Sequence, residues 1–189
     1  MDTCIFADHF TSIDSSNMLL KAVLTDDDLS ATLRLHLISE KLIESWICAV
    51  CGSSSLFVNT KFPVQIETFS KINMAINMGF PEEIGRAFLV LNSLRNDVAH
   101  NPLKSSIPDS RIQSFAAMTN NYLVASGLKT LDTRTAIIRD EDGKITETIT
   151  MDSGCQNRLK LCFIFTELLS IVLRIIAQKH LSFQLPGHL

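Results

Sequence analysis

The 189-residue sequence contains few residues that break or bend a chain: seven glycines and five prolines. That scarcity excludes collagen-like and low-complexity chains, and an apolar fraction of 46% excludes an intrinsically disordered chain. There is no Pro-, Gly- or Ser-rich linker and no internal repeat. A single domain over residues 1–189 is therefore expected, because a chain of this length can bury one full core but is short for two.

The sequence also lacks the short motifs of several enzyme classes. It has no Gly-rich phosphate loop, no HExxH and no GxSxG, which removes the usual support for nucleotide hydrolases, zinc proteases and serine hydrolases. Cys48 and Cys51 form a lone CxxC within a predicted helix, without the two further ligands that zinc requires. We therefore expect two small buried cysteines, no metal and no cofactor.

The N-terminal residues lack the basic segment and apolar core of a secretory leader. With five irregularly spaced cysteines, the sequence predicts reduced thiols in a cytoplasmic protein. The most apolar stretch, 161–177, is interrupted by Glu167 and Arg174. It is therefore predicted to be an amphipathic core helix, with no membrane contact.

Negative charge is concentrated at one end of the chain. The net charge is −3, yet residues 1–30 hold six acidic residues and one basic residue, a local −5, which leaves +2 for residues 31–189. A broad basic surface for nucleic acid is therefore excluded, but a compact anion site is not.

Hydrophobic periodicity predicts an all-α, up-and-down bundle of four to five main helices. Residues 1–25 are expected to form an N-terminal arm and a short helix. About the first dozen residues are irregular and docked through Ile5, Phe6 and Phe10, and the helix covers 16–24. β-branched residues around an Asp-Gly turn predict a small hairpin within 135–150. The longer helices are predicted at 29–51, 67–78, 81–100, 109–124 and 152–180, with a frayed tail at 183–189.

Polar residues mark two positions in the first long helix. The triplet Asp26–Asp28 precedes it, where carboxylates cap free amides and oppose the helix dipole, so we interpret the triplet as a helix start and not as a metal cluster. His36, Glu40 and Glu44 stand four residues apart and form a polar stripe on one face. The helix predicted at 67–78 has an apolar face made of Phe69, Ile72, Ala75 and Ile76.

The most informative stretch is 91–102, where polar side chains crowd the end of an otherwise apolar helix. Asn96 and His100 share a helical face, and Arg95 lies about 100° around the helix from Asn96. The arginine side chain is long enough to cross that gap and bring its guanidinium toward the imidazole. Arginine is a permanent bidentate phosphate ligand, and histidine exchanges protons near neutral pH. Together they suffice for metal-independent RNA cleavage, in which a 2′-hydroxyl attacks the adjacent phosphate.

Two interpretations of this stretch stay open on the residues alone. One imidazole does not comfortably serve as both base and acid, whereas a symmetric dimer would supply two. In the structural alternative, the helix dipole favours His100 at a helix C-terminus, and Arg95 pairs with Asp97 or Glu40.

The run 94–100 resembles the Arg-Asn-x-x-x-His motif of the HEPN (higher eukaryotes and prokaryotes nucleotide-binding) superfamily. Residues 33–44, 69–79 and 165–170 extend the resemblance to its mannitol operon repressor-like (MltR-like) branch, over roughly residues 29–180. The resemblance implies a helical bundle and a homodimer in which the two motif helices meet.

The resemblance implies two different functions. Ribonuclease members imply a toxin or defence endoribonuclease, with Arg95 as phosphate clamp, His100 as acid–base group, Asn96 as orienting residue, Glu40 and Asp97 as supporting residues, and RNA and an antitoxin as partners. The MltR-like branch implies a non-catalytic transcriptional regulator or adaptor. It would act through a regulatory protein partner, because no helix-turn-helix is present to read DNA. A nucleotide-sensing pocket at Arg95 and His100 is a third interpretation.

Overall fold

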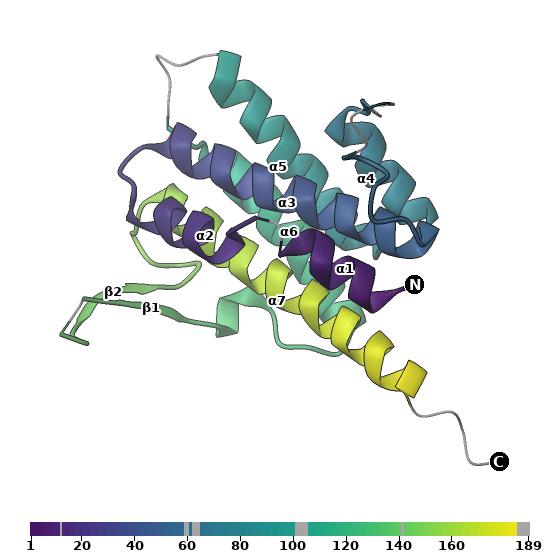
Figure 1. Cartoon of the computed structure of the whole chain (residues 1–189). Coiled ribbons are helices and arrows are strands. Elements are labelled where there is room, and N and C mark those ends of the chain that lie inside the picture. The colour runs from purple at the N-terminus through teal and green to yellow at the C-terminus, as the bar shows by residue number, and fades with distance from the viewer. Residues whose placement is uncertain (12, 59–60, 62–64, 101–105, 141, 185–189) are drawn as a thin grey trace.

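The computed structural model describes residues 1–11, 13–58, 61, 65–100, 106–140 and 142–184, with the backbone alone over 181–184. Within these residues the chain is mostly helical and carries one small antiparallel hairpin (Figure 1). The helices are α1 (Thr3–Phe10), α2 (Ser15–Leu24), α3 (Asp28–Cys51), α4 (Thr68–Asn77), α5 (Glu82–His100), α6 (Asp109–Ala125) and α7 (Asn157–Gln184). The hairpin pairs β1 (Ala136–Arg139) with β2 (Ile145–Ile149) and follows the short 3-10 helix η1 (Leu131–Thr133).

Helix α3 begins and ends as the sequence predicts. The side chain of Asp27 accepts hydrogen bonds from two backbone N–H groups of the first turn, at 3.2 and 2.9 Å, so the acidic triplet does cap the helix. Gly52 ends α3 in the left-handed conformation, with φ 67°, which a residue with a side chain rarely adopts. Both ends of this helix are therefore fixed by local sequence.

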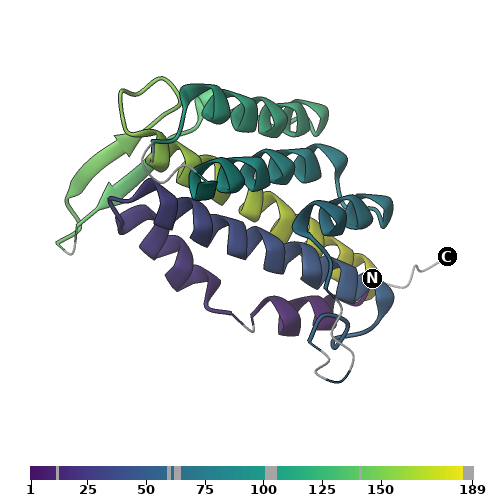
Figure 2. The same ribbon diagram turned by 90° about the horizontal axis from the view of Figure 1, so that it is seen from above.

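Hydrogen bonds at the helix ends set the directions of the long helices. Asn157, which opens α7, donates to the carbonyl of Ile107, and the N–H of Ile107 donates to the Asp28 carboxylate, both at 2.9 Å. The starts of α3, α6 and α7 thus lie together, and α5 runs back between α3 and α6 (Figure 2). The expected up-and-down order holds through α6 but is wrong for α7, because residues 126–156 return the chain to the same end.

The core lies between the four long helices and is built around aromatic side chains. Trp46, Phe88, Phe115 and Phe165 come from α3, α5, α6 and α7 and are fully buried. The predicted apolar stripe of α5 is confirmed, since Phe88, Leu91, Leu94 and Val98 are all buried. Burial of this stripe fixes the rotation of α5 and directs its polar residues away from the core.

The N-terminal arm is helical, which corrects the expectation of an irregular segment. Asp2 accepts hydrogen bonds from two backbone N–H groups at the start of α1, and Phe6 and Phe10 are buried as predicted. This short segment is therefore stable as a helix because Asp2 caps its first turn and its aromatic rings pack against the core. The short helix predicted at 16–24 is confirmed as α2.

Two further boundary and face predictions are wrong. Phe69 is 55% exposed, because α4 turns Ile72 and Ala75 toward the core instead. The last helix starts at residue 157, not 152, because the hydroxyl of Ser153 closes a turn on the carbonyl of Thr150. It extends through residue 184, so the predicted tail begins later, and its last five residues lie outside the described ones. Within the described part of the chain, no helix combines the length and apolar character needed to cross a membrane.

Candidate functional site

The last two turns of α5 carry Arg95, Asn96 and His100. Arg95 and Asn96 are half-buried, and His100 is exposed at the final residue of the helix. Because the buried stripe of α5 holds its opposite side against the core, these three side chains lie at the surface of the bundle.

Arg95 is oriented by its neighbour. Its Nη1 donates to Oδ1 of Asn96 at 2.9 Å, so the guanidinium crosses the gap that separates the two residues on the helix. Its Nε is buried without a hydrogen-bond partner in the described part of the chain. Because Nε is buried and Nη1 donates to Asn96, Nη2 is the guanidinium nitrogen best placed to bind an anion.

No described carboxylate forms an ion pair with Arg95, which removes the structural alternative for this residue. Asp97 instead pairs with Arg111 of α6. Glu40 accepts from Lys71 of α4 at 2.8 Å and from Thr68 at 3.0 Å. The structure therefore assigns both predicted supporting residues to other contacts and leaves the positive charge of Arg95 available.

A buried ion-pair cluster lies beside this site. Lys71, with a side chain 9% exposed, contacts Glu40 at 2.8 Å and Glu44 at 2.6 Å. Burial alone would lower the pKa of Lys71, but its bonds to the two glutamates outweigh burial and raise it. Burial likewise opposes ionisation of Glu40, yet the bond from Lys71 brings the pKa of Glu40 below its usual value. The two glutamates of the predicted polar stripe are thus covered by α4 and paired with Lys71.

A pair that the sequence does not place at the site joins α3 to α5. His36, 5% exposed, lies with its Nε2 3.0 Å from Oδ1 of Asn92. An amide oxygen only accepts, so Nε2 carries the proton and donates. Burial, helped by the charge of Arg95, lowers the pKa of His36. The spacing of His36 in the polar stripe was the available signal, but spacing does not name Asn92 as its partner.

The other metal- and redox-type candidates gain no support. Among the described residues, no group of three or more His, Cys, Asp or Glu side chains is arranged to hold a metal ion. All five cysteines are free thiols. Cys48 is buried as expected, but Cys51 is exposed, because it lies at the last residue of α3.

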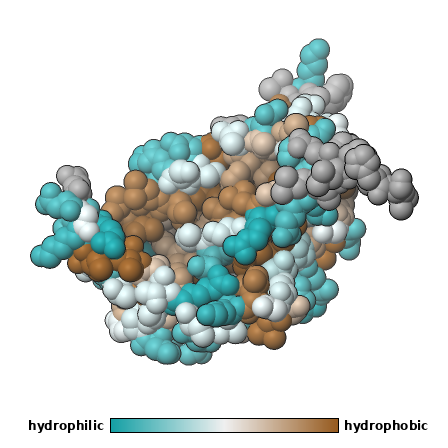
Figure 3. Space-filling view, turned by 90° about the horizontal axis from the view of Figure 1, so that it is seen from below, coloured by the Kyte–Doolittle hydropathy of each residue, from teal (hydrophilic) through white to brown (hydrophobic). Residues whose placement is uncertain are grey.

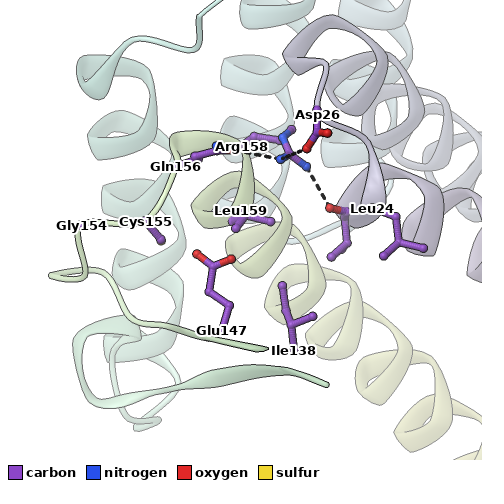
Figure 4. A pocket seen from close by; sticks show the side chains of 10 residues that line it. Leu24, Asp26, Ile138, Glu147, Gly154, Cys155, Gln156, Arg158 and Leu159 are labelled. Atoms are coloured by element: carbon purple, nitrogen blue, oxygen red, sulfur yellow. Dashed lines mark hydrogen bonds and ion pairs between the residues drawn. The ribbon is translucent and has the colours of Figure 1, made fainter. Parts of the chain in front are cut away.

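A hollow of about 430 Å³ lies between the hairpin and the start of α7 (Figure 4). Glu147 and Ile138 point into it from the strands, and Arg158 lies on the opposite wall. Arg158 is already held: it donates to the carbonyl of Val23 and to the side chain of Gln156, each at 2.8 Å. Its role is to tie α2 to α7, and we place the candidate site on α5.

Comparison of this chain with protein-family models, with curated proteins and with solved structures finds no match.

Proposed function

We propose that this protein is a HEPN-like, homodimeric, metal-independent endoribonuclease whose site is formed by Arg95, Asn96 and His100. The observation that carries the proposal is the unneutralised guanidinium of Arg95, held by Asn96 next to the exposed end of α5. A fixed arginine without a carboxylate partner is a ready ligand for a phosphodiester.

The proposed reaction needs two proton transfers around that phosphate. A neutral imidazole takes the proton from the 2′-hydroxyl, whose oxygen attacks phosphorus. The bond from phosphorus to the 5′-oxygen breaks, and a protonated imidazole gives its proton to that oxygen. The products are a 2′,3′-cyclic phosphate and a 5′-hydroxyl. Arg95 stabilises the added negative charge on the phosphate oxygens.

A second copy of the chain supplies the second imidazole. A two-fold axis next to the exposed end of α5 brings the two His100 side chains and the two Arg95 side chains to one cleft. Leu37 of α3 is 50% exposed, and we choose it as the apolar side chain that tests the interface. We expect light scattering of the wild type to give twice the mass of one chain. The variant Leu37→Glu should have the mass of one chain and should not cleave RNA.

The cleavage assay uses single-stranded RNA and excess chelator. Arg95→Ala is expected to lower kcat/KM by at least roughly a hundredfold, since one transition-state donor is worth about 10²–10³ in rate. Arg86→Ala is the matched control: Arg86 lies on the same helix, exposed and paired with Glu82. Equal activity in the two variants would contradict the site assignment.

The alternative is a non-catalytic, MltR-like regulator or adaptor that binds a regulatory protein. One observation favours it: apolar side chains gather on the face of the molecule that is seen from below, opposite α5 (Figure 3). Leu20, Leu24 and Leu173 are 56%, 66% and 40% exposed. Under this alternative, substitutions of Arg95 and His100 leave partner binding intact, whereas Leu24→Asp removes it.

A further inference from the structure

The pair formed by His36 and Asn92 joins α3 to the helix that carries the proposed anion site, and the charge of Arg95 acts on His36. Asn92 comes three residues before Arg95, so the two side chains leave α5 on neighbouring turns of one face. His36 donates to Asn92 from α3 at 3.0 Å. The buried imidazole thereby ties α5, one turn before Arg95, to α3.

The charged groups around His36 come from three helices. Arg95 of α5 and Lys71 of α4 disfavour its protonation, whereas Glu40 of α3 favours it. Lys71 and Glu40 largely offset one another, since they form an ion pair at 2.8 Å. Arg95 is therefore the neighbouring charge without a compensating group, and an anion bound to it would remove its effect on His36.

We propose that His36 is the positioning residue of the α5 site, and that an anion bound to Arg95 and a proton bound to His36 stabilise one another. This inference rests on the proposed anion site but not on RNA cleavage. His36 does not touch the anion. It acts through Asn92, which holds the helical turn, and through the electrostatic field that it shares with Arg95. Linkage requires the effect to be reciprocal: the anion raises the proton affinity of His36, and the proton raises the anion affinity.

The direct test follows the ring signals of His36 by NMR during a pH titration. The probe is a fully 2′-O-methylated RNA oligonucleotide, which keeps the phosphates but has no 2′-hydroxyl to attack. In the wild type we expect saturation with this probe to raise the pKa of His36 by roughly half a unit or more, which by linkage is about threefold tighter binding at low pH. In the variant Arg95→Met the pKa of His36 should also be higher than in the wild type, without any probe.

Two substitutions separate positioning from simple packing. His36→Gln keeps an N–H able to reach Asn92 but does not titrate, whereas His36→Leu removes the donor. We expect His36→Gln to bind the probe like wild type at pH 7.5 and to lose the strengthening at pH 5.5. His36→Leu should bind several-fold more weakly at both pH values. A control, His9→Gln, alters a buried histidine that contacts Ser45 and should leave probe affinity unchanged.

The inference is overturned if the His36 titration is the same with and without the probe and in Arg95→Met. It is also overturned if the two His36 variants bind like wild type at both pH values. Cleavage is a separate outcome: a wild type that shifts His36 on binding but leaves unmodified RNA intact contradicts the proposed ribonuclease and supports the linked site.

Discussion

Arg95 and Asn96 are consecutive residues of α5, and the guanidinium of the first donates to the side-chain oxygen of the second at 2.9 Å. Successive side chains on a helix point about 100° apart, so this bond requires Arg95 to lie along the helix surface. The amide is neutral and leaves the positive charge of Arg95 in place. The identity of residue 96 therefore decides whether Arg95 is available to a phosphate.

Asn96→Asp should abolish this availability with almost no change in shape. The new carboxylate would pair with Arg95 and compete with the phosphate, and we expect at least about tenfold weaker binding of the 2′-O-methylated RNA, equivalent to about 1.4 kcal/mol. Fluorescence anisotropy measures it. Asn121→Asp makes the same charge change at an exposed position of α6 and should bind normally. Equal weakening in both variants would mean that net charge, not Arg95, governs binding.

Lys71→Met should destabilise the fold strongly. The substitution leaves Glu40 and Glu44, 25% and 17% exposed, without the cation that holds them, and we expect a loss of about 3 kcal/mol in the free energy of unfolding. Urea denaturation measures it. Arg86→Met breaks an exposed pair with Glu82 and should cost less than about 0.5 kcal/mol. Similar losses in the two variants would show that the buried cluster adds no special stability.

Acid should weaken the fold in two separate steps. Burial lowers the pKa of His9 and of His36, so the unfolded chain takes up protons first and stability falls as the pH drops below about 6.5. The pKa of Glu40 is also lowered, and its contribution is lost only as the pH falls below the usual glutamate range. Each unit of depression is worth about 1.4 kcal/mol.

The measurement for the first step is the urea midpoint at pH 7.5 and at pH 5.5. It should fall in the wild type and fall less in the double variant His9→Gln, His36→Gln. A midpoint that is constant or that rises on acidification would contradict the burial of two neutral imidazoles.

Gly85 is required by the close approach of α4 to α5. A Cβ at this position would lie 2.6 Å from Cδ1 of Ile76, so Gly85→Ala should cost about 1–3 kcal/mol despite the higher helix propensity of alanine. Combining Gly85→Ala with Ile76→Ala removes the clash. In urea denaturation the double variant should therefore lose less stability than the sum of the losses of the two single variants. Gly154→Ala meets no atom within 4 Å and is the control. Strict additivity would show that no clash occurs.

Most helices follow from local patterns because their causes are local. Periodicity, the Asp27 cap and the Gly52 stop predict α3 to within one residue, and the buried stripe of α5 is readable for the same reason. The direction of α7 is not readable, because it depends on how the segment 126–156 returns across the bundle. The prediction that Phe69 is buried is wrong for a related reason. Periodicity identifies the apolar face of a helix, but packing decides which part of that face is covered.

Part of the candidate site is likewise predictable from local sequence, and part of it is not. Helical geometry brings Arg95 and Asn96 together because they are consecutive, and it places His100 about one turn further along α5. Partners that arrive from other helices are not predictable by spacing: Lys71 is 31 residues from Glu40, and Asn92 is 56 residues from His36. Those long-range contacts decide that Glu40 is held away from Arg95 and that His36 is tied to the site.

We propose that His100 transfers protons to and from RNA held by Arg95. Wild type and His100→Ala, with folding checked by circular dichroism, are incubated with single-stranded RNA in excess chelator, and the new ends are identified by mass spectrometry. We predict 2′,3′-cyclic phosphate and 5′-hydroxyl ends from the wild type and a cleavage rate at least about a hundredfold lower in His100→Ala. Intact RNA with the wild type, or equal cleavage by the two proteins, would contradict it.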